Sequence, residues 1–187
     1  MSKNTQKKID SKGFTVWFTG LACSGKSTIA DALVPILKKK GFKVERLDGD
    51  IVRQSLTKDL GFSVEDRRKN IERVTFVAKL LTRNDVVVLA TFISPEIGMR
   101  ENAKKEVGNF VEVFVKCSVD GCMKRDVKGM YKKALAGQIK DFTGVHASAP
   151  YEEPPNPELV VDTEKNTIDQ CVRLVLDMLV DLGYIKP

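Results

Sequence analysis

Short apolar runs alternate with longer segments of helical hydrophobic spacing along most of this chain. The runs with strand character cover residues 14–19, 43–47, 86–90, 110–116 and 159–162. Most of them are apolar throughout, which is typical of strands buried on both faces in a parallel sheet. The alternation therefore predicts an α/β fold, with a mostly parallel sheet and helices on both of its faces.

Three longer segments have the spacing of amphipathic helices. The first runs from about 26 to 40, and Pro35 predicts a kink in it. The second begins near Val64 after the capping residue Ser63, with Asp66 at the position of a capping box. The expected apolar faces are Ile71, Val74, Ala78 and Leu81 in the second helix, and Ile168, Val172, Val175, Leu176 and Leu179 in a third helix at 167–182.

Both patterns stop between Asp126 and Asn156. The stretch contains three glycines and a cluster of prolines near its end, and it is long for a loop in a compact domain. Loops of this length commonly serve as lids or binding loops. We expect a flexible N-terminal arm at residues 1–12 and a single domain at 13–187, with a lid at about 126–156.

The composition narrows the classes of function. Of the 187 residues, 42% are hydrophobic and 30% are charged, which is an ordinary soluble balance. The apolar runs are too short to span a bilayer, and the polar N-terminus lacks the apolar core of a secretory signal. The four cysteines show no pairing or metal spacing, so reduced thiols in a cytoplasmic protein are expected. No basic run interleaves with aromatic residues, so the net charge of +6 indicates small anionic ligands rather than nucleic acid.

The most informative motif is the segment 20–28, which reads Gly-Leu-Ala-Cys-Ser-Gly-Lys-Ser-Thr. It matches G-x-x-x-x-G-K-[ST] and lies between a strand and a helix, as phosphate-binding loops do. Lys26 can reach the β- and γ-phosphates, and the Ser27 hydroxyl can ligate Mg²⁺. The motif predicts a three-layer P-loop NTPase fold that binds ATP and Mg²⁺. The residues expected to bind ATP are Gly20, Leu21, Ala22, Cys23, Ser24, Gly25, Lys26, Ser27 and Thr28.

Two carboxylates, Asp48 and Asp50, follow the second predicted strand. The carboxyl edge of a parallel sheet forms the ligand crevice. The usual partner of a phosphate-binding loop is an aspartate that ends an apolar strand, but the run 86–90 is followed by Thr-Phe-Ile-Ser-Pro. Asp48 and Asp50 are therefore candidates for the metal-organising or base function; the alternative is a turn with solvated carboxylates.

Basic side chains recur after this point. Arg53 lies on a predicted short helix, and Arg67 and Asn70 share one face of the next helix. A guanidinium suits phosphate or sulfate, although a solvated helix surface would look similar. A third basic cluster, 125–133, opens the lid, and a cationic lid can close over a nucleotide. We expect Arg125 on the ATP side; the alternative is a solvated charge run.

Together these motifs resemble the adenylylsulfate kinase (adenosine-5′-phosphosulfate kinase) family over residues 14–162. The motifs that carry the resemblance are 20–28, Leu47–Arg53, Asp59–Ser63, Asp66-Arg67 with Asn70-Ile71, Phe92–Pro95, Arg125–Tyr131, Ile139–Gly144 and Pro150–Glu152. The resemblance implies transfer of the γ-phosphoryl group of Mg-ATP to the ribose 3′-hydroxyl of adenylyl sulfate, in sulfate assimilation. It also implies a homodimer.

The resemblance further implies roles for individual residues. Arg53, Arg67 and Asn70 would hold the phosphosulfate and ribose, while Phe62 and Phe142 would sandwich the adenine. The full set of expected substrate-binding residues is Asp48, Asp50, Arg53, Phe62, Arg67, Asn70, Ile93, Ser94, Lys128, Lys140 and Phe142. The expected catalytic residues are Lys26, Asp50 and Ser94, and the expected metal-binding residues are Ser27 and Asp50.

The family's serine at Ser94 is described as a residue that can become phosphorylated. Direct in-line attack by the 3′-hydroxyl is the simpler expectation, with Asp50 as base or as water-mediated holder of Mg²⁺. Two departures from the family pattern stand out: Cys23 replaces a small residue, commonly Gly, and the turn 145–149 is longer.

Several alternatives stay open at this point. Gluconate, shikimate and nucleoside-monophosphate kinases share the loop motif, and a nucleotide-binding module without turnover is the non-enzymatic alternative. The chain could also correspond to one domain of a larger sulfurylase–kinase polypeptide; its starting Met and short polar arm favour a free-standing enzyme.

Overall fold

The computed structural model describes residues 12–187, so the arm expected at residues 1–12 lies almost wholly outside the described residues. Five strands form one sheet in the order β2-β3-β1-β4-β5, and every neighbouring pair is parallel. The strands are β1 (Thr15–Thr19), β2 (Lys43–Asp48), β3 (Val86–Thr91), β4 (Phe110–Lys116) and β5 (Leu159–Asp162). The predicted parallel sheet is confirmed, and each predicted strand agrees within one residue at either end.

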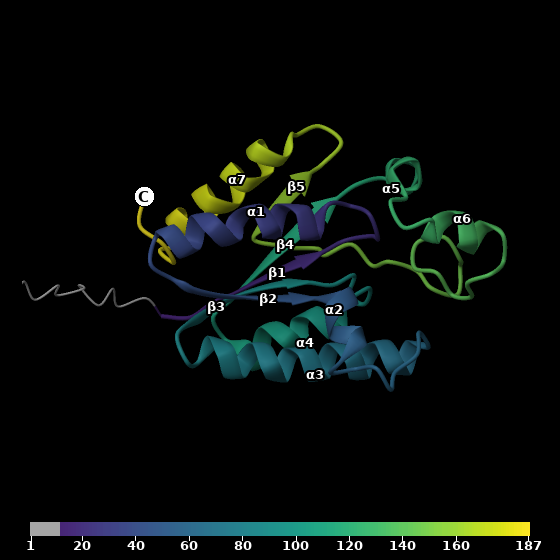
Figure 1. Ribbon diagram of the computed structural model, residues 1–187, viewed down its shortest axis with the longest axis horizontal. Helices are drawn as coiled ribbons and strands as arrows, with labels where there is room; N and C mark the ends of the chain where they lie inside the picture. The colour runs from purple at the N-terminus through teal and green to yellow at the C-terminus, as the bar shows by residue number, and fades with distance from the viewer. Residues whose placement is uncertain (1–11) are drawn as a thin grey trace, which may run out of the picture.

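Helices cover both faces of this sheet, as Figure 1 shows. The helices are α1 (Lys26–Lys39), α2 (Gly49–Gln54), α3 (Val64–Thr82), α4 (Ile97–Val107), α5 (Val119–Arg125), α6 (Met130–Leu135) and α7 (Ile168–Asp181). Helices α1 and α7 lie on one face, and α3 and α4 pack together on the other. The expected three-layer P-loop fold is confirmed. None of the helices in residues 12–187 is both long and apolar enough to cross a membrane.

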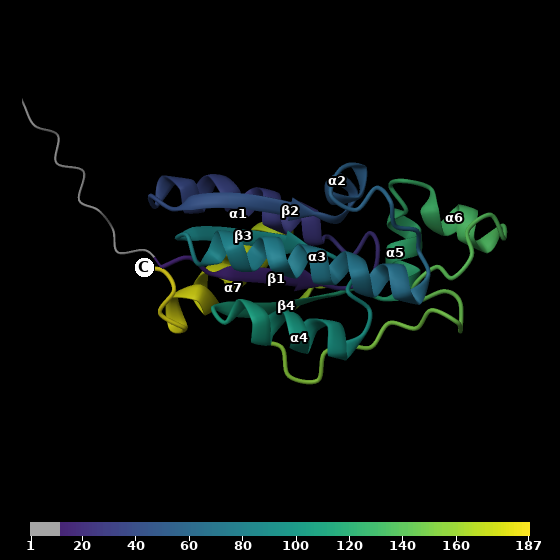
Figure 2. The same cartoon turned by 90° about the horizontal axis from the view of Figure 1, so that it is seen from below.

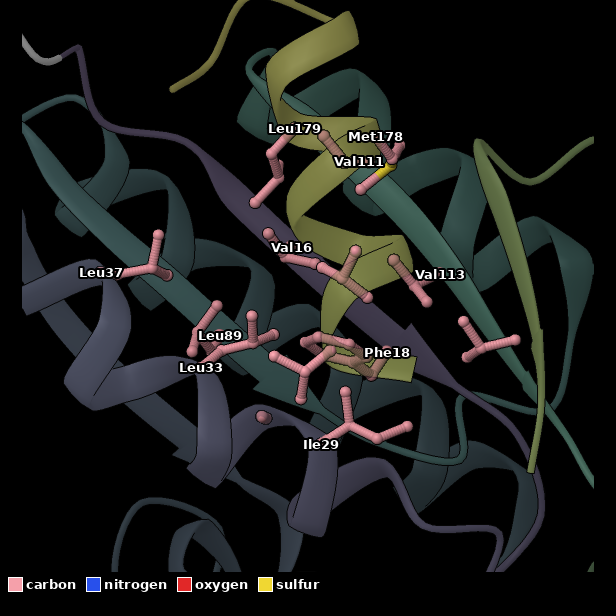
Figure 3. Packing of buried hydrophobic residues seen from close by; sticks show 14 of the residues in the cluster. Val16, Phe18, Ile29, Leu33, Leu37, Leu89, Val111, Val113, Met178 and Leu179 are labelled. Atoms are coloured by element: carbon pink, nitrogen blue, oxygen red, sulfur yellow. The ribbon is translucent and has the colours of Figure 1, made fainter. Parts of the chain in front are cut away.

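The alternation of side chains along β1 divides the core into two clusters. Val16 and Phe18 point to the face that α1 and α7 cover, where Leu33 and Leu179 are fully buried (Figure 3). Trp17 points to the opposite face and packs with residues of α3 and α4. Because successive strand residues face opposite sides, one buried strand supports both layers. This central strand leads directly into the phosphate-binding loop.

The structure differs from the sequence-based prediction in its short and polar helices. Helices α4 and α5 were not predicted, and α6 lies inside residues 126–156, the segment expected to act as a lid and called the lid below, where no element was expected. Ile168, assigned to the apolar face of α7, is half exposed. The expected cap of α3 is present, since the Ser63 hydroxyl accepts a 3.1 Å hydrogen bond from the Asp66 amide. The Asp66 carboxylate accepts from the Ser63 hydroxyl, so the capping box is only half formed.

The carboxyl ends of the strands all point toward one end of the molecule. Figures 1 and 2 show α2, α5 and α6 gathered at this end, away from the C-terminus. The loops that follow β1, β2, β3, β4 and β5 therefore meet there, as the ligand crevice of an open α/β sheet requires. The lid adds α6 and the irregular chain around it to the same edge.

Candidate active site

The loop between β1 and α1 is shaped by two glycines. Gly20 has φ of 144°, and a Cβ there would lie 2.5 Å from the carbonyl oxygen of Val115. Gly25, with φ of 107°, is the N-cap of α1 and offers no side chain to cap it. The first-turn amides of α1 have no intrahelical acceptor, so they remain available to phosphate oxygens at the positive end of the helix dipole. Non-glycine residue Cys23 also takes the left-handed conformation, at φ of 60°.

Lys26 is buried at the base of this loop. Its ammonium donates hydrogen bonds to the carbonyl oxygens of Gly20, at 2.9 Å, and Leu21, at 2.6 Å. Among residues 12–187 no carboxylate forms an ion pair with it. Burial lowers the pKa of Lys26 from 10.5 to about 8. A buried cation that rests only on neutral oxygens fits a site that receives an anion such as the terminal phosphates of ATP.

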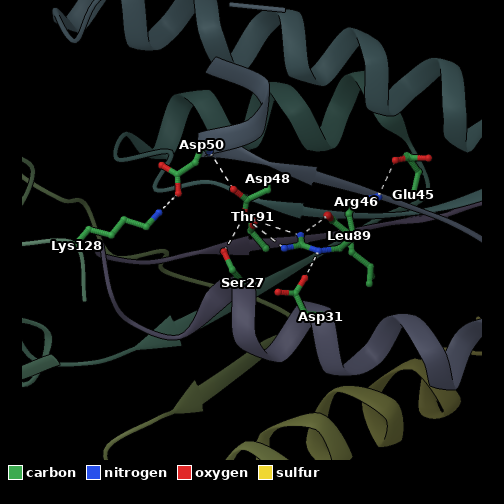
Figure 4. A network of polar contacts seen from close by, with 9 residues as sticks. All are labelled: Ser27, Asp31, Glu45, Arg46, Asp48, Asp50, Leu89, Thr91 and Lys128. Carbon is green, nitrogen blue, oxygen red and sulfur yellow. Dashed lines mark hydrogen bonds and ion pairs between the residues drawn. The ribbon is translucent and has the colours of Figure 1, made fainter. Parts of the chain in front are cut away.

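A second polar group joins the loop to the ends of two strands (Figure 4). The hydroxyls of Ser27 and Thr91 donate to Asp48 Oδ2, at 2.7 Å and 2.9 Å. Arg46 lies 3.4 Å from the same oxygen. Burial opposes ionisation of Asp48, but these hydroxyls and the backbone amide of Asp50 outweigh it, so the pKa of Asp48 lies below its usual value. The carboxylate in contact with Ser27 is thus Asp48, which was one of the two candidates from the sequence.

Asp50 takes a different position, on the first turn of α2. Its carboxylate forms an ion pair with Lys128 of the lid (Figure 4), and this hydrogen bond raises the pKa of Lys128. The two side chains are 65% and 59% exposed, so the pair adds little to stability. It does link the segment expected to act as a lid to α2, and both side chains line the cavity that contains the phosphate-binding loop. In residues 12–187 no group of three or more His, Cys, Asp or Glu side chains could hold a metal ion by itself. A Mg²⁺ ion that enters with substrate phosphates and keeps its waters needs only one or two protein ligands, so this donor set fits it.

Two arginines of α2 and α3, Arg53 and Arg67, also line the site. The Arg53 guanidinium lies 4.3 Å from the ring centre of Phe62 and donates to the Gly61 carbonyl at 2.9 Å. Arg67 donates to the hydroxyl of Thr143 and to a lid carbonyl, which ties α3 to the lid. Burial, with the neighbouring Arg67 charge second, lowers the pKa of Arg53. Two adjacent guanidinium groups that carry this desolvation cost favour an anionic ligand between them.

The two rings predicted to sandwich the adenine differ in exposure. Phe62 is 57% exposed, with Arg53 over its ring, and Phe142 is buried. Asn70 is also buried, and its amide oxygen accepts a 2.8 Å hydrogen bond from Thr57. Both aromatic rings and Asn70 lie in the wall of the same cavity. A base that stacks on Phe62 would either displace the Arg53 guanidinium from one face of the ring or use the opposite face.

Ser94 follows β3 in a strained conformation, with φ of 40°. Its hydroxyl accepts a 3.0 Å hydrogen bond from Trp17 Nε1 and lies 3.2 Å from Thr19 Oγ1. The Arg100 guanidinium holds its carbonyl at 2.5 Å. The carbonyl of Ile93 accepts from Thr19 at 2.8 Å. Side chains of β1 and the Arg100 side chain of α4 therefore hold the residues after β3 in place.

Arg125 clamps the back of the loop. Its guanidinium donates to the carbonyl of Ser24 at 3.1 Å and to the hydroxyl and carbonyl of Thr163 at 2.9 Å and 2.7 Å. Thr163 follows β5, and Asn166, Ile168 and Cys171 continue the cavity wall from there. Unlike Arg125, the residues Thr163, Asn166, Ile168 and Cys171 were not predicted as site residues from the sequence. The only signal was that they follow the carboxyl end of a strand, where ligand sites gather.

Most of these groups line one cavity of about 1050 Å³. Its wall contains every predicted site residue except Gly20, Leu21 and Ser24, which are buried residues of the loop itself. Pockets for a single drug-sized ligand commonly measure about 300–1,000 Å³, so this cavity lies at the upper end of that range. Its wall combines the phosphate-binding loop, Lys26 and Asp48 with a second set of arginine and aromatic side chains, which are Arg53, Phe62, Arg67 and Phe142.

A phosphate-binding loop that shares one cavity with a second set of basic and aromatic side chains is typical of a P-loop phosphotransferase. The family model for adenylylsulphate kinase matches residues 12–162. The probable adenylyl-sulfate kinase of Pseudomonas aeruginosa is 57% identical over 168 residues, which covers 90% of this chain and 78% of that one. The adenylyl-sulfate kinase of Halothermothrix orenii is 52% identical over 175 residues, or 94% of either chain. The chain belongs to the adenylylsulphate kinase family.

Solved structures agree with this assignment. The structure of the Mycobacterium tuberculosis APS kinase CysC in complex with AMPPNP and APS has a TM-score of 0.85 at 42% identity, covering 90% of this chain and 98% of that one. A gluconokinase from Sinorhizobium meliloti has a TM-score of 0.62 at 18% identity, with coverage of 92% and 94%. The second likeness shows the shared fold alone.

Proposed function

We propose that this chain transfers the γ-phosphoryl group of Mg-ATP to the ribose 3′-hydroxyl of adenylyl sulfate, giving ADP and 3′-phosphoadenylyl sulfate in sulfate assimilation. The observation that carries the proposal is the single cavity whose wall combines the phosphate-binding loop with Arg53, Arg67 and Phe142. The relative from Halothermothrix orenii is named adenylyl-sulfate kinase. The similar Mycobacterium tuberculosis structure is a complex with AMPPNP and APS.

In the donor half, the loop amides and Lys26 bind the β- and γ-phosphates of ATP. Arg125 and Thr163 hold the loop from behind, through the carbonyl of Ser24. Bound Mg²⁺ would neutralise phosphate charge, and Ser27 with a neighbouring carboxylate would hold it. Asp48 contacts Ser27 and so suits the metal's water shell. Asp50, expected from the sequence at the metal and as the base, is proposed here as the base.

In the acceptor half, Arg53, Arg67 and Asn70 bind the phosphosulfate and ribose, and Phe62 and Phe142 bind the adenine. The 3′-hydroxyl oxygen forms a bond to the γ-phosphorus as the bond to the ADP oxygen breaks. Asp50 accepts the proton that the hydroxyl loses. Lys128 and Lys140 approach from the lid, where positive charge stabilises the transferring group.

Direct transfer between the two substrates is proposed, without a phosphoserine intermediate. Ser94 is only 1% exposed, and its hydroxyl already forms hydrogen bonds with Trp17 and Thr19. Attack by such a hydroxyl would require it to leave both partners. We propose that Ser94 shapes the acceptor pocket.

The test of the proposed activity is ADP release with four acceptors at micromolar concentration: adenylyl sulfate, AMP, gluconate and shikimate. Turnover with adenylyl sulfate alone is expected. Absence of that turnover in a protein that still binds ATP would refute the proposal. Turnover with another acceptor would assign a different small-molecule kinase, and ATP binding with no turnover at all would leave a nucleotide-binding module.

We also propose a homodimer and a cytoplasmic location. The support for assembly is Phe76, which stands 61% exposed beside a hollow between α3 and α4. The support for the location is the four cysteines, all of which are free thiols. Light scattering on the purified protein tests the dimer, and Phe76→Glu should favour the monomer.

A further inference from the structure

Tyr131 lies between the two halves of the site. It belongs to α6 of the lid and is 1% exposed. Its phenol donates a 3.0 Å hydrogen bond to the carbonyl oxygen of Ala22 in the phosphate-binding loop. Its ring meets the ring of Phe142 edge to face, with centroids 4.9 Å apart and planes at 74°. One side chain therefore contacts both the donor loop and an aromatic ring of the acceptor pocket.

The position of Tyr131 is set by its own helix. Both carboxylate oxygens of Asp126 accept hydrogen bonds from backbone amides, one from Tyr131 at 3.1 Å and one from Lys132 at 3.0 Å. These bonds fix the start of α6. Around the ring lies a small apolar cluster, separate from the two clusters on the sheet, which contains Leu21, Cys117, Cys122, Tyr131, Ala134 and Phe142.

The lid also packs closely on the loop at a second point. A Cβ on Gly144 of the lid would lie 2.5 Å from Leu21 Cδ2, so any larger residue there would displace the Leu21 side chain, and the φ of 80° at Gly144 also favours glycine. Lid and loop thus share one packed interface. A shift of either one moves atoms of the other, since close-packed groups do not deform continuously.

The hydrogen bond from Tyr131 has a direct effect on phosphate binding. A peptide group is planar and trans, so fixing the carbonyl of Ala22 also fixes the amide of Cys23, which points the opposite way. Both residues line the cavity. Cys23 sits at φ of 60°, a conformation that a side chain disfavours, so the orientation of this peptide needs outside support. Tyr131 provides it.

We propose that Tyr131 is a positioning residue that couples donor binding at the Ala22–Cys23 peptide to acceptor binding at Phe142. The inference rests on the proposed function and names how its two subsites communicate. Either ligand orders the interface of lid and loop, and the second ligand then binds an interface that is already ordered. The coupling is reciprocal, as linkage requires.

The experiment is a calorimetric titration of adenylyl sulfate into the full chain, with and without saturating AMPPNP and Mg²⁺. In the wild type, we expect AMPPNP to tighten adenylyl sulfate binding at least about 5-fold, within the usual range of coupling between sites. In Tyr131→Phe, which keeps the ring and removes the hydroxyl, the factor should fall below about 2-fold. The reverse titration should give the same factors.

Tyr184→Phe is the matched control. Tyr184 packs on Phe14 at the other end of the fold, with centroids 4.8 Å apart, and its variant should keep wild-type coupling. A purely structural Tyr131 would lower the melting temperature of Tyr131→Phe and leave the coupling factor unchanged. That result would overturn the inference, as would a wild type in which AMPPNP has no effect on adenylyl sulfate binding. A wild type that neither binds nor phosphorylates adenylyl sulfate would refute the proposed function and this inference together, whereas turnover without coupling refutes the inference alone.

Discussion

The hydroxyl of Thr91 donates a 2.9 Å hydrogen bond to Asp48 Oδ2, and the two residues pair in register at the ends of β3 and β2. Strand β3 carries no acid at its end, and its neighbour β2 supplies one. The Ser27 hydroxyl, which is the metal-binding group of the loop motif, contacts the same oxygen. The edge strand thus takes over a position that P-loop enzymes commonly fill from β3.

Asp48→Asn tests whether the carboxylate at the end of β2 does the work of the acid that β3 lacks. The amide keeps the size of the side chain and loses the charge, so kcat/KM for Mg-ATP should fall roughly 10- to 100-fold, as for groups that hold a metal's outer shell. Steady-state kinetics against Mg²⁺ concentration measure the effect. Asp31→Asn is the control, because Asp31 also bonds Arg46 but lies outside the cavity. Equal activity of the two variants would contradict the role of Asp48.

Lys26→Met should lower kcat by about 1,000-fold, since it removes a positive charge aimed at the transferring phosphate. Single-turnover and steady-state kinetics measure the effect.

Lys26→Met should also change how the free energy of unfolding depends on pH. The pKa of Lys26 is about 8 in the folded protein and 10.5 in the unfolded chain, so the folded state binds fewer protons between these values. Stability of the wild type therefore rises with pH across this window, by up to about 3 kcal/mol.

Urea unfolding of the wild type and Lys26→Met from pH 7 to pH 10.5 isolates this contribution. Relative to the variant, the wild type should gain stability as the pH rises above 8. A difference between the two proteins that stays constant with pH would show that Lys26 is not desolvated in the free protein.

Ser94→Ala should retain turnover within about tenfold of the wild type. The variant leaves the indole N–H of Trp17 without its acceptor, which should cost about 1–3 kcal/mol of stability. No radioactive phosphate from labelled ATP should remain on the wild-type protein. Loss of turnover to background, together with a labelled wild type, would establish a phosphoserine intermediate instead.

Phe62→Ala should act on the acceptor alone. Stacking of a base on an aromatic ring contributes about 1–3 kcal/mol, so the KM for adenylyl sulfate should rise roughly 5- to 100-fold. The KM for ATP and the melting temperature should change little, because Phe62 is 57% exposed. Leu135→Ala, in an equally exposed position of the lid outside the cavity, should leave both KM values intact.

Cys23→Gly should have kinetic constants within twofold of the wild type. Glycine relieves the left-handed strain at this position, worth about 1–2 kcal/mol, and loses about 0.5–1 kcal/mol through the entropy of the unfolded chain. Urea unfolding should therefore show a net gain of stability of about 0–1.5 kcal/mol. A tenfold loss of kcat would assign the thiol a role in the reaction.

The elements that the sequence predicted well are those whose pattern is repeated over many positions. The buried strands and the long helices α1, α3 and α7 place apolar residues at regular spacing, so the predicted bounds of the strands, of α1 and of α7 and the predicted start of α3 agree within one residue. Helix α4 was missed because Met99, Ala103 and Val107 are its few core contacts in a polar segment. Helices α5 and α6 have only 7 and 6 residues, too short for a periodic signal.

The residues of the site likewise fall into those that a local sequence pattern predicted and those that only the fold brings together. The loop motif and the family's other motifs predicted most of the cavity wall, because their chemistry depends on residue type and local spacing. Thr163 and Asn166 were not predicted, since each is a single polar residue after a short strand and acts only through the fold. The contact of Arg53 with Phe62, and that of Tyr131 with Ala22, depend on how the lid and α2 pack over the sheet.

The third apolar cluster has a consequence for motion. Its members from the lid pack on each other and on Leu21, and they do not extend into either core beside the sheet. Such a unit can unfold locally while the five strands stay intact. Amides between 126 and 156 should then exchange with solvent hydrogen far faster than those of β1, and nucleotide should slow them. The phosphate-binding loop lies on the border between a rigid scaffold and a segment with its own melting equilibrium.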